Sequence, residues 1–212
     1  MSPLLIALLG ILLIPLFVAT WRTSLLGVGC QGLIMAFIAY RLDPTPSTPG
    51  DWIALADLAI VRGFGAPFAL YTVLRAQNAP PRNDLIPPNL LSWTLALGMV
   101  LVSFSFAELL VSDPGEQRTL VAVAAAGVLL GFLVLATQSG PFSQMIGALR
   151  IENAIALLEL GGEKHESPLG VQLGFLGVFI ATIAFFRWYL TRFAASEAKG
   201  GVGATGPENR AA

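Results

Sequence analysis

Apolar residues follow one another along this chain in long runs that are broken mainly by proline, glycine and clusters of charge. A bilayer core of about 30 Å is crossed by a helix of about 20 apolar residues. The runs therefore predict seven membrane-spanning helices, at about 3–20, 23–40, 52–75, 89–111, 119–137, 143–160 and 169–190. The expected fold is an all-α integral membrane protein, in which a bundle of about seven transmembrane helices forms a single domain over residues 1–190.

Composition supports a membrane protein and excludes several other classes. Of the 212 residues, 55% are hydrophobic and only 12% are charged, and the mean hydropathy is +0.74. A soluble domain cannot bury that much apolar surface. The net charge of −1 and the lack of a basic stripe with interleaved aromatic residues exclude nucleic acid as a partner. The single Cys30 and single His165 exclude a disulfide framework and a Cys/His zinc cluster, so we expect no metal and no cofactor bound by this chain.

The distribution of basic residues predicts the orientation in the membrane. Cytoplasmic connections of membrane proteins are enriched in Lys and Arg. One set of alternate connections, together with the C-terminus, holds Arg22, Arg75, Arg82, Arg187, Arg192, Lys199 and Arg210, whereas the other set holds Arg41, Arg118 and Lys164. We therefore expect a cytoplasmic C-terminus and an outside N-terminus. The glycine-rich residues 191–212 are expected to form a flexible cytoplasmic tail.

Ionisable residues inside the expected spans are the first candidates for function, because each costs a few kcal/mol to insert. Six such residues are present: Asp57, Arg62, Glu108, Arg150, Glu152 and Glu159. Three of them, Asp57, Glu108 and Glu159, lie near the non-cytoplasmic ends of their helices, where a solvated helix end explains them as well as a function does. Arg62 and Glu152 lie near mid-span, where a functional role is favoured.

The sixth span combines several polar groups in one helix. Glu152 and Glu159 are seven residues apart and share a face, about 10 Å apart along the axis, whereas Arg150 points to the opposite side. Arg150 therefore cannot neutralise Glu152, which must be protonated or paired with a cation on another helix. Arg62 is an available cation. We hypothesise that Glu152 accepts protons and faces a hydrated bundle interior.

The third span carries a helix-breaking signal beside its arginine. In Arg62-Gly63-Phe64-Gly65-Ala66-Pro67, the proline lacks an N–H and disrupts the helical hydrogen bond one turn earlier, so we expect a kink with exposed carbonyls near Gly63. Such breaks often line ion paths, although a kink that only improves packing is the alternative. Elsewhere, two glycine patterns predict close helix contacts: Gly127 with Gly131, and Gly170 with Gly174 and Gly177.

Three short stretches resemble the hydrogenase-4 component E family, a large relative of the three-helix subunit K of respiratory complex I. Gln31-Gly32-Leu33 resembles a Gln-Gly-Leu helix of that family, Arg62-Gly63-x-x-x-Pro67 followed by Arg75 resembles its Lys-Gly-x-x-x-Pro pattern, and Glu152-Asn153 resembles its Glu-Asn pair. The last three helices would correspond to the part that resembles subunit K and the C-type subunits of cation/proton antiporters.

The resemblance implies a non-catalytic subunit of a complex I-like redox complex in the bacterial inner membrane, such as a group 4 nickel–iron hydrogenase or a formate hydrogenlyase. Its partners would be the other membrane and peripheral subunits, antiporter-like subunits among them, and the nickel–iron and iron–sulfur centres would lie on those partners. Its buried charges would contribute to a proton path or coupling axis between the redox arm and the antiporter-like subunits.

Two departures from the family pattern affect that path. The usual glutamate of a Val-Glu-Leu-Gly segment is Gln172 here, and the usual lysine of the third span is Arg62, which stays protonated and is a counter-ion rather than a relay. We therefore expect a shortened or rerouted path with reduced pumping competence. Two alternatives remain: a structural or assembly subunit of a membrane complex, and a cation/proton antiporter-type subunit or transporter.

Overall fold

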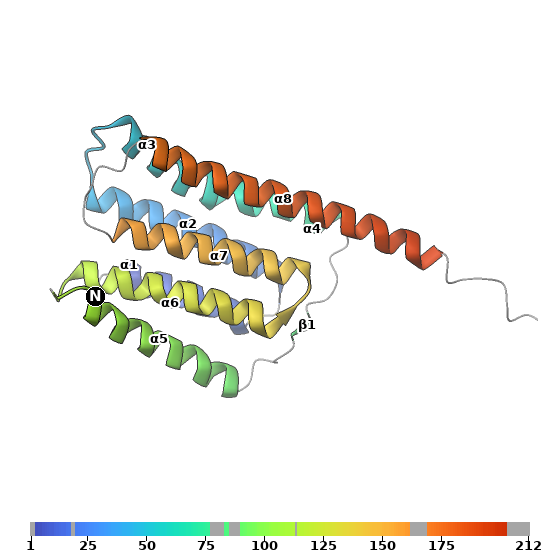
Figure 1. The fold of residues 1–212 in the computed structure, drawn as a ribbon, viewed down its shortest axis with the longest axis horizontal. Helices are drawn as coiled ribbons and strands as arrows, with labels where there is room; N and C mark the ends of the chain where they lie inside the picture. Colours follow the sequence, from blue (N-terminus) through green and yellow to red (C-terminus); the bar gives the residue numbers. More distant parts are fainter. Residues whose placement is uncertain are drawn as a thin grey trace, which may run out of the picture.

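The computed structural model describes residues 3–17, 20–76, 83–84, 90–112, 114–161 and 169–202. Almost all of these are helical (Figure 1). The helices are α1 (Pro3–Phe17), α2 (Trp21–Leu42), α3 (Pro49–Ala56), the π-helix η1 (Asp57–Gly65), α4 (Ala66–Ala76), α5 (Leu90–Leu110), α6 (Glu116–Thr137), α7 (Pro141–Leu160) and α8 (Leu169–Val202). Two residue pairs, β1 (Asn83–Asp84) and β2 (Gln138–Ser139), form a short antiparallel bridge.

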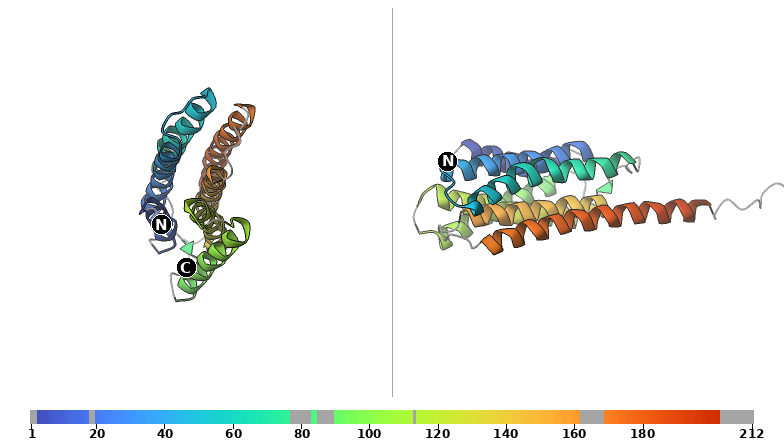
Figure 2. Two further views of the ribbon diagram at one scale, coloured as in Figure 1. Left: turned by 90° about the vertical axis from the view of Figure 1, so that its left-hand side faces the viewer. Right: turned by 90° about the horizontal axis from the view of Figure 1, so that it is seen from above.

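The helices form two layers, which Figure 2 shows from the end and from above. One layer holds α1, α2 and the continuous rod of α3, η1 and α4, and the other holds α5, α6, α7 and α8. Between the layers, α1 contacts α6, α2 contacts α7, and α3 and α4 contact α8. In the first layer, α2 and the rod of α3, η1 and α4 therefore face α7 and α8. The charged residues near mid-span lie where these helices meet.

Five helices of the described chain are long and apolar enough to cross a membrane: Trp21–Leu42, Pro49–Ala76, Leu90–Leu110, Glu116–Thr137 and Leu169–Arg192. Of the other two expected spans, the first coincides with α1, which is apolar but shorter, and the sixth coincides with α7, which carries the charged residues. The prediction of an all-α protein with apolar spans is confirmed at this level. The count of seven spans and the orientation of the termini stay predictions.

The last helix is longer than the sequence pattern predicted. The expected flexible tail began at residue 191, but α8 continues as a helix to Val202 and extends beyond the other helices (Figure 1). Good helix formers, among them Ala194, Ala195 and Ala198, explain the continuation. Residues 203–212 lie outside the described residues, as does His165.

Of the two glycine patterns, one lies in a close helix contact, between α6 and α7, and the other, on α8, does not. The α6–α7 pair is in extensive contact, and a Cβ at Gly127 or Gly131 would lie 2.8 Å from Ala154 Cβ or 2.5 Å from Ile151 Cγ1. By contrast, the glycines of α8 at 170, 174 and 177 have nothing within 4 Å of a Cβ position. The glycine pattern predicts a contact without telling whether the partner belongs to this chain. Among the described residues the α8 glycines make no such contact, because α8 packs through its opposite side.

Candidate functional site

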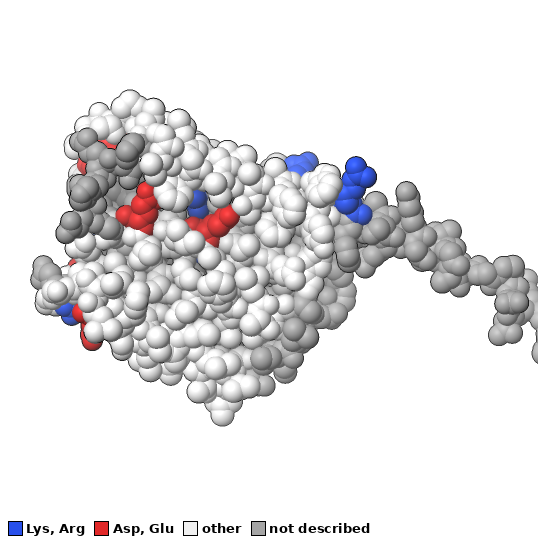
Figure 3. Space-filling model, viewed as in Figure 1, with Lys and Arg blue, Asp and Glu red and all other residues white. Residues whose placement is uncertain are grey.

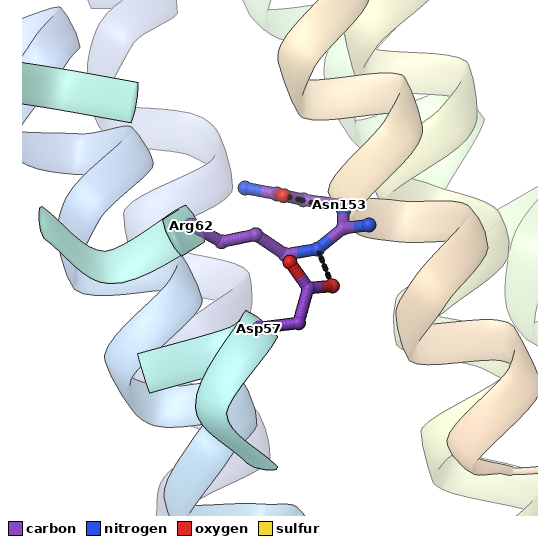
Figure 4. A network of polar contacts seen from close by, with 3 residues as sticks. All are labelled: Asp57, Arg62 and Asn153. Carbon is purple, nitrogen blue, oxygen red and sulfur yellow. Dashed lines mark hydrogen bonds and ion pairs between the residues drawn. The ribbon is translucent and has the colours of Figure 1, made fainter. Parts of the chain in front are cut away.

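A buried ion pair occupies the point where the two layers meet. Arg62 of η1 donates from Nε to Asp57 Oδ2 at 2.8 Å and from Nη1 to Asn153 Oδ1 of α7 at 3.0 Å (Figure 4). Its guanidinium carbon lies 4.0 Å from the ring centre of Phe179 of α8, which is a cation–π contact. Arg62 is 3% exposed and Asp57 is 9% exposed. One arginine thus joins three segments that are distant in the sequence.

The backbone of η1 explains how Asp57 and Arg62 meet. In an α-helix, residues five apart are not neighbours on one face, because the near neighbours are three and four apart. A π-helix closes its hydrogen bonds between residues five apart, and the N–H of Ala66 accordingly donates to Val61 O. The wider turn places Asp57 directly beside Arg62. Pro67, which lacks an N–H, follows the π-helix by two residues and favours such an irregular segment.

The expected exposed carbonyls next to Pro67 are instead covered by α2. A Cβ at Gly29 would lie 2.8 Å from Gly63 O, and a Cβ at Gly32 would lie 2.7 Å from both the carbonyl carbon of Arg62 and the amide nitrogen of Gly63. Only glycine allows this approach, since these atoms of Arg62 and Gly63 belong to the backbone and cannot rotate away. The kinked segment therefore packs against a helix rather than lining an open path at this position.

Glu152 lies at the edge of the same cluster, where α7 and α8 make few contacts. Its Oε1 accepts a hydrogen bond of 2.8 Å from Thr182 Oγ1, and the charge of Arg62 acts on its carboxylate. Its Oε2 is buried and has no hydrogen-bond partner among the described residues. Figure 3 shows acidic side chains with a basic group set between them, on the face where α7 and α8 run side by side. The carboxylate is thus half-buried rather than enclosed in the bundle interior.

The charges of this centre do not balance when every group is ionised. Arg62 offers one positive charge to the two carboxylates of Asp57 and Glu152, and its hydrogen bonds go to Asp57 and Asn153. A second carboxylate at this depth is stabilised by taking up a proton or a monovalent cation. The free Oε2 of Glu152 is the position open to such a cation. Chemically, the arrangement can bind and release one positive charge.

Arg150 is separate from this centre. It is fully buried, and its two terminal nitrogens donate to Leu12 O at 3.1 Å and to Ile11 O at 3.0 Å of α1. The helical donor to the Ile11 carbonyl would be the N–H of residue 15, which is a proline. Arg150 therefore supplies the Ile11 carbonyl with a hydrogen bond that the α1 backbone cannot provide, and adds a second bond to Leu12 O. Its prediction as part of the proton path receives no support from this geometry.

The remaining predicted site residues also lie apart from the ion pair. Glu159 is exposed near the end of α7, and Glu108 is exposed near the end of α5. Gln172 lies at the start of α8 beside Gly50 of α3, with its Oε1 buried and unpaired among the described residues. About 15 Å of helix separates Gln172 from Thr182. Of the seven predicted residues, the structure brings together Asp57, Arg62 and Glu152.

Three residues of the cluster were not predicted as site residues: Asn153, Phe179 and Thr182. Asn153 could have been found, because the sequence places this polar amide inside an expected span, directly after Glu152. Thr182 and Phe179 are common residues in apolar helices, so no sequence signal distinguishes them. Gln31 is also fully buried, and neither polar atom of its amide has a partner among the described residues.

The comparisons with known proteins give no independent identification. No protein-family model, no curated protein and no solved structure matches this chain. Among the described residues, no group of three or more His, Cys, Asp and Glu could hold a metal ion.

Proposed function

We propose that this chain is a non-catalytic membrane subunit of a complex I-like redox complex of the hydrogenase-4 or formate hydrogenlyase type, and that its polar centre carries protons. The nickel–iron and iron–sulfur centres would belong to partner subunits in the bacterial inner membrane. The observation that carries the proposal is the polar centre of Asp57, Arg62 and Asn153, with the half-buried Glu152 at its edge.

The three stretches that resemble component E converge at this centre. Gly32 of the first stretch contacts the backbone of Arg62 and Gly63 in the second, and Arg62 hydrogen-bonds Asn153 in the third. Nothing in the sequence spacing requires stretches about 30 and 90 residues apart to meet. Their convergence supports a shared role for these residues. The resemblance to component E indicates the type of complex in which they would have that role.

Proton transfer would use Glu152. Its Oε1 is held by Thr182, which leaves Oε2 to take or release a proton, while Arg62 supplies a fixed positive charge beside it. Because Arg62 stays protonated and is held by Asp57 and Asn153, it acts as a counter-ion and not as a carrier. Reduced or rerouted pumping remains part of the proposal, since Gln172 cannot titrate and lies away from the cluster.

Two measurements test the proposal. The full chain, tagged at its C-terminus and extracted in mild detergent, should co-purify with a hydrogenase-like large subunit, an iron–sulfur subunit and antiporter-like proteins. In membrane vesicles, Glu152→Gln should abolish or strongly reduce proton translocation by the assembled complex, and Glu108→Gln, at an exposed helix end, should not. Purification without any redox protein would overturn the subunit assignment. Unchanged translocation in both Glu152→Gln and Glu152→Ala would overturn the proton-carrying role.

A further inference from the structure

Exposed basic residues lie at one end of the bundle. Arg75 ends α4, and Arg187 and Arg192 lie on the part of α8 that passes it; all three are exposed. We call these three residues the basic rim. Figure 3 shows basic side chains gathered at the end where α4 stops and α8 continues. None of the helical segments that begin or end here contains Asp or Glu, as the residues 20–27, 66–76, 90–98, 130–149 and 179–192 show. Asp84 of β1, which pairs with Gln138 of β2, is an acidic residue at the same end.

The packing of α4 against α8 brings Arg75 and Arg187 to the same end of the bundle. Leu74 of α4 and Leu190 of α8 belong to one buried apolar cluster, so the ends of the two helices are in contact. Arg75 follows Leu74 directly, and Arg187 is less than one turn before Leu190. The opposite end of the bundle is different, because its helix ends carry carboxylates at Asp43 and Asp51 as well as Arg41.

The outward face of α8 carries aromatic rings at the same level. Phe185 contacts both Trp188 and Tyr189, with ring centres 6.2 and 6.3 Å apart, and Phe185 and Trp188 are 58% and 56% exposed. Arg192 lies one turn beyond Trp188 on this face. Tryptophan and tyrosine with adjacent arginine are typical of the boundary between the acyl chains and the headgroups.

The length of α8 gives a second estimate of where the boundary between acyl chains and headgroups would lie on this helix. A bilayer core of about 30 Å takes up about 20 helical residues. Counted from Leu169, where α8 begins beside the start of α3, the core ends near Trp188 and Tyr189. On this count Arg192 would lie in the headgroup layer, where α8 continues past the bundle. The basic rim and the aromatic rings would then meet the bilayer at the depth of the lipid phosphates.

We propose that the basic rim and the adjacent aromatic face of α8 form a binding site for the headgroup of an anionic phospholipid. The arginines would bind the phosphate and its net negative charge, and Phe185 and Trp188 would contact the first part of the acyl chains. A zwitterionic lipid carries the same phosphate together with a positive choline group, which these arginines repel. The proposal concerns the lipid contacts of this chain and is independent of the redox complex to which it would belong.

The test uses tryptophan fluorescence as a local probe in the full chain. Trp21, Trp52 and Trp93 are replaced by Phe, which leaves Trp188 as the reporter, and the protein is reconstituted in phosphatidylcholine vesicles that contain increasing fractions of brominated phosphatidylglycerol or brominated phosphatidylcholine. The matched control keeps Trp52 instead, which is 60% exposed at the opposite end of the bundle.

We expect brominated phosphatidylglycerol to quench Trp188 at a several-fold lower fraction than brominated phosphatidylcholine, and the two lipids to quench Trp52 equally. Each of Arg75→Gln, Arg187→Gln and Arg192→Gln should reduce the preference by up to about fivefold, and Arg41→Gln should leave it unchanged. Equal quenching of Trp188 by both lipids would overturn the proposal. A preference that survives the triple Arg→Gln variant, or one that inorganic phosphate abolishes at constant ionic strength, would overturn it as well.

Discussion

Replacement of Arg62 by methionine is the sharpest test of the polar centre. Methionine keeps an unbranched side chain of similar length but removes the charge, the hydrogen bonds to Asp57 and Asn153, and the contact with Phe179. It leaves Asp57 buried without its counter-ion. We therefore expect Arg62→Met to be among the most destabilising single substitutions in the protein.

The magnitude follows from the burial of both partners. Breaking a buried ion pair by removing one charge costs about 3–5 kcal/mol. The double variant Asp57→Leu with Arg62→Met removes both charges, so its cost is that of leaving the Asn153 amide oxygen without its donor, about 1–3 kcal/mol. The second substitution should thus restore part of the stability that the first removes.

Unfolding of the detergent-solubilised protein by increasing SDS, followed by circular dichroism, measures these differences. Arg41→Met is the matched control, because Arg41 is exposed at the end of α2, and it should change the free energy of unfolding by less than about 0.5 kcal/mol. The reasoning is refuted if Arg62→Met costs less than about 1 kcal/mol. It is equally refuted if the double variant loses as much free energy of unfolding as the two single variants lose together.

Two further predictions concern helix contacts. Arg150→Met should destabilise the protein by about 3 kcal/mol, because two backbone carbonyls of α1 lose charged donors. Adding Pro15→Ala should recover part of this loss, since it restores the N–H that reaches Ile11 O; no recovery would contradict the role given to Arg150. Gly32→Ala should cost about 1–3 kcal/mol by forcing a Cβ into the η1 backbone. Gly98→Ala should be neutral or slightly stabilising, because a Cβ at Gly98 has nothing within 4 Å. SDS unfolding measures all four variants, and equal effects of the two glycine substitutions would contradict the packing argument.

The sequence predicts the positions of the helices well, because apolar runs of bilayer length leave few alternatives. The expected spans at 23–40, 52–75, 89–111, 119–137 and 169–190 coincide with helices that are long and apolar enough to cross a membrane. Helix ends are less predictable. Residues 191–202 lack the apolar pattern, yet they continue α8. Residues 191–199 contain neither proline nor glycine, and the helix ends at Val202, after Gly200 and Gly201.

The π-helix could not be predicted from the residues that form it. Pro67 and the neighbouring glycines predict an irregular backbone, and the sequence argument placed a kink there. Whether the irregularity becomes a kink, a break or a π-helix depends on what stabilises the extra residue. Here the Asp57–Arg62 pair within η1 and the close approach of Gly29 and Gly32 of α2 do so, and the second of these is a tertiary contact that η1's own sequence does not reveal.

The two buried arginines show why the position of a charge within an expected span does not by itself reveal its function. Both Arg62 and Arg150 lie within spans that the sequence predicts, and both are nearly inaccessible in the structure. The cost of inserting them is similar, so the sequence argument treated both as candidates for the proton path. Arg62 faces a carboxylate, an amide and an aromatic ring, which leaves an additional carboxylate, Glu152, only partly neutralised. Arg150 faces two carbonyls of α1, one of which lacks its helical donor because residue 15 is proline, and its role there is to satisfy the backbone. The difference lies in what stands opposite each arginine: the side chains of Asp57, Asn153 and Phe179 for Arg62, and the α1 backbone for Arg150.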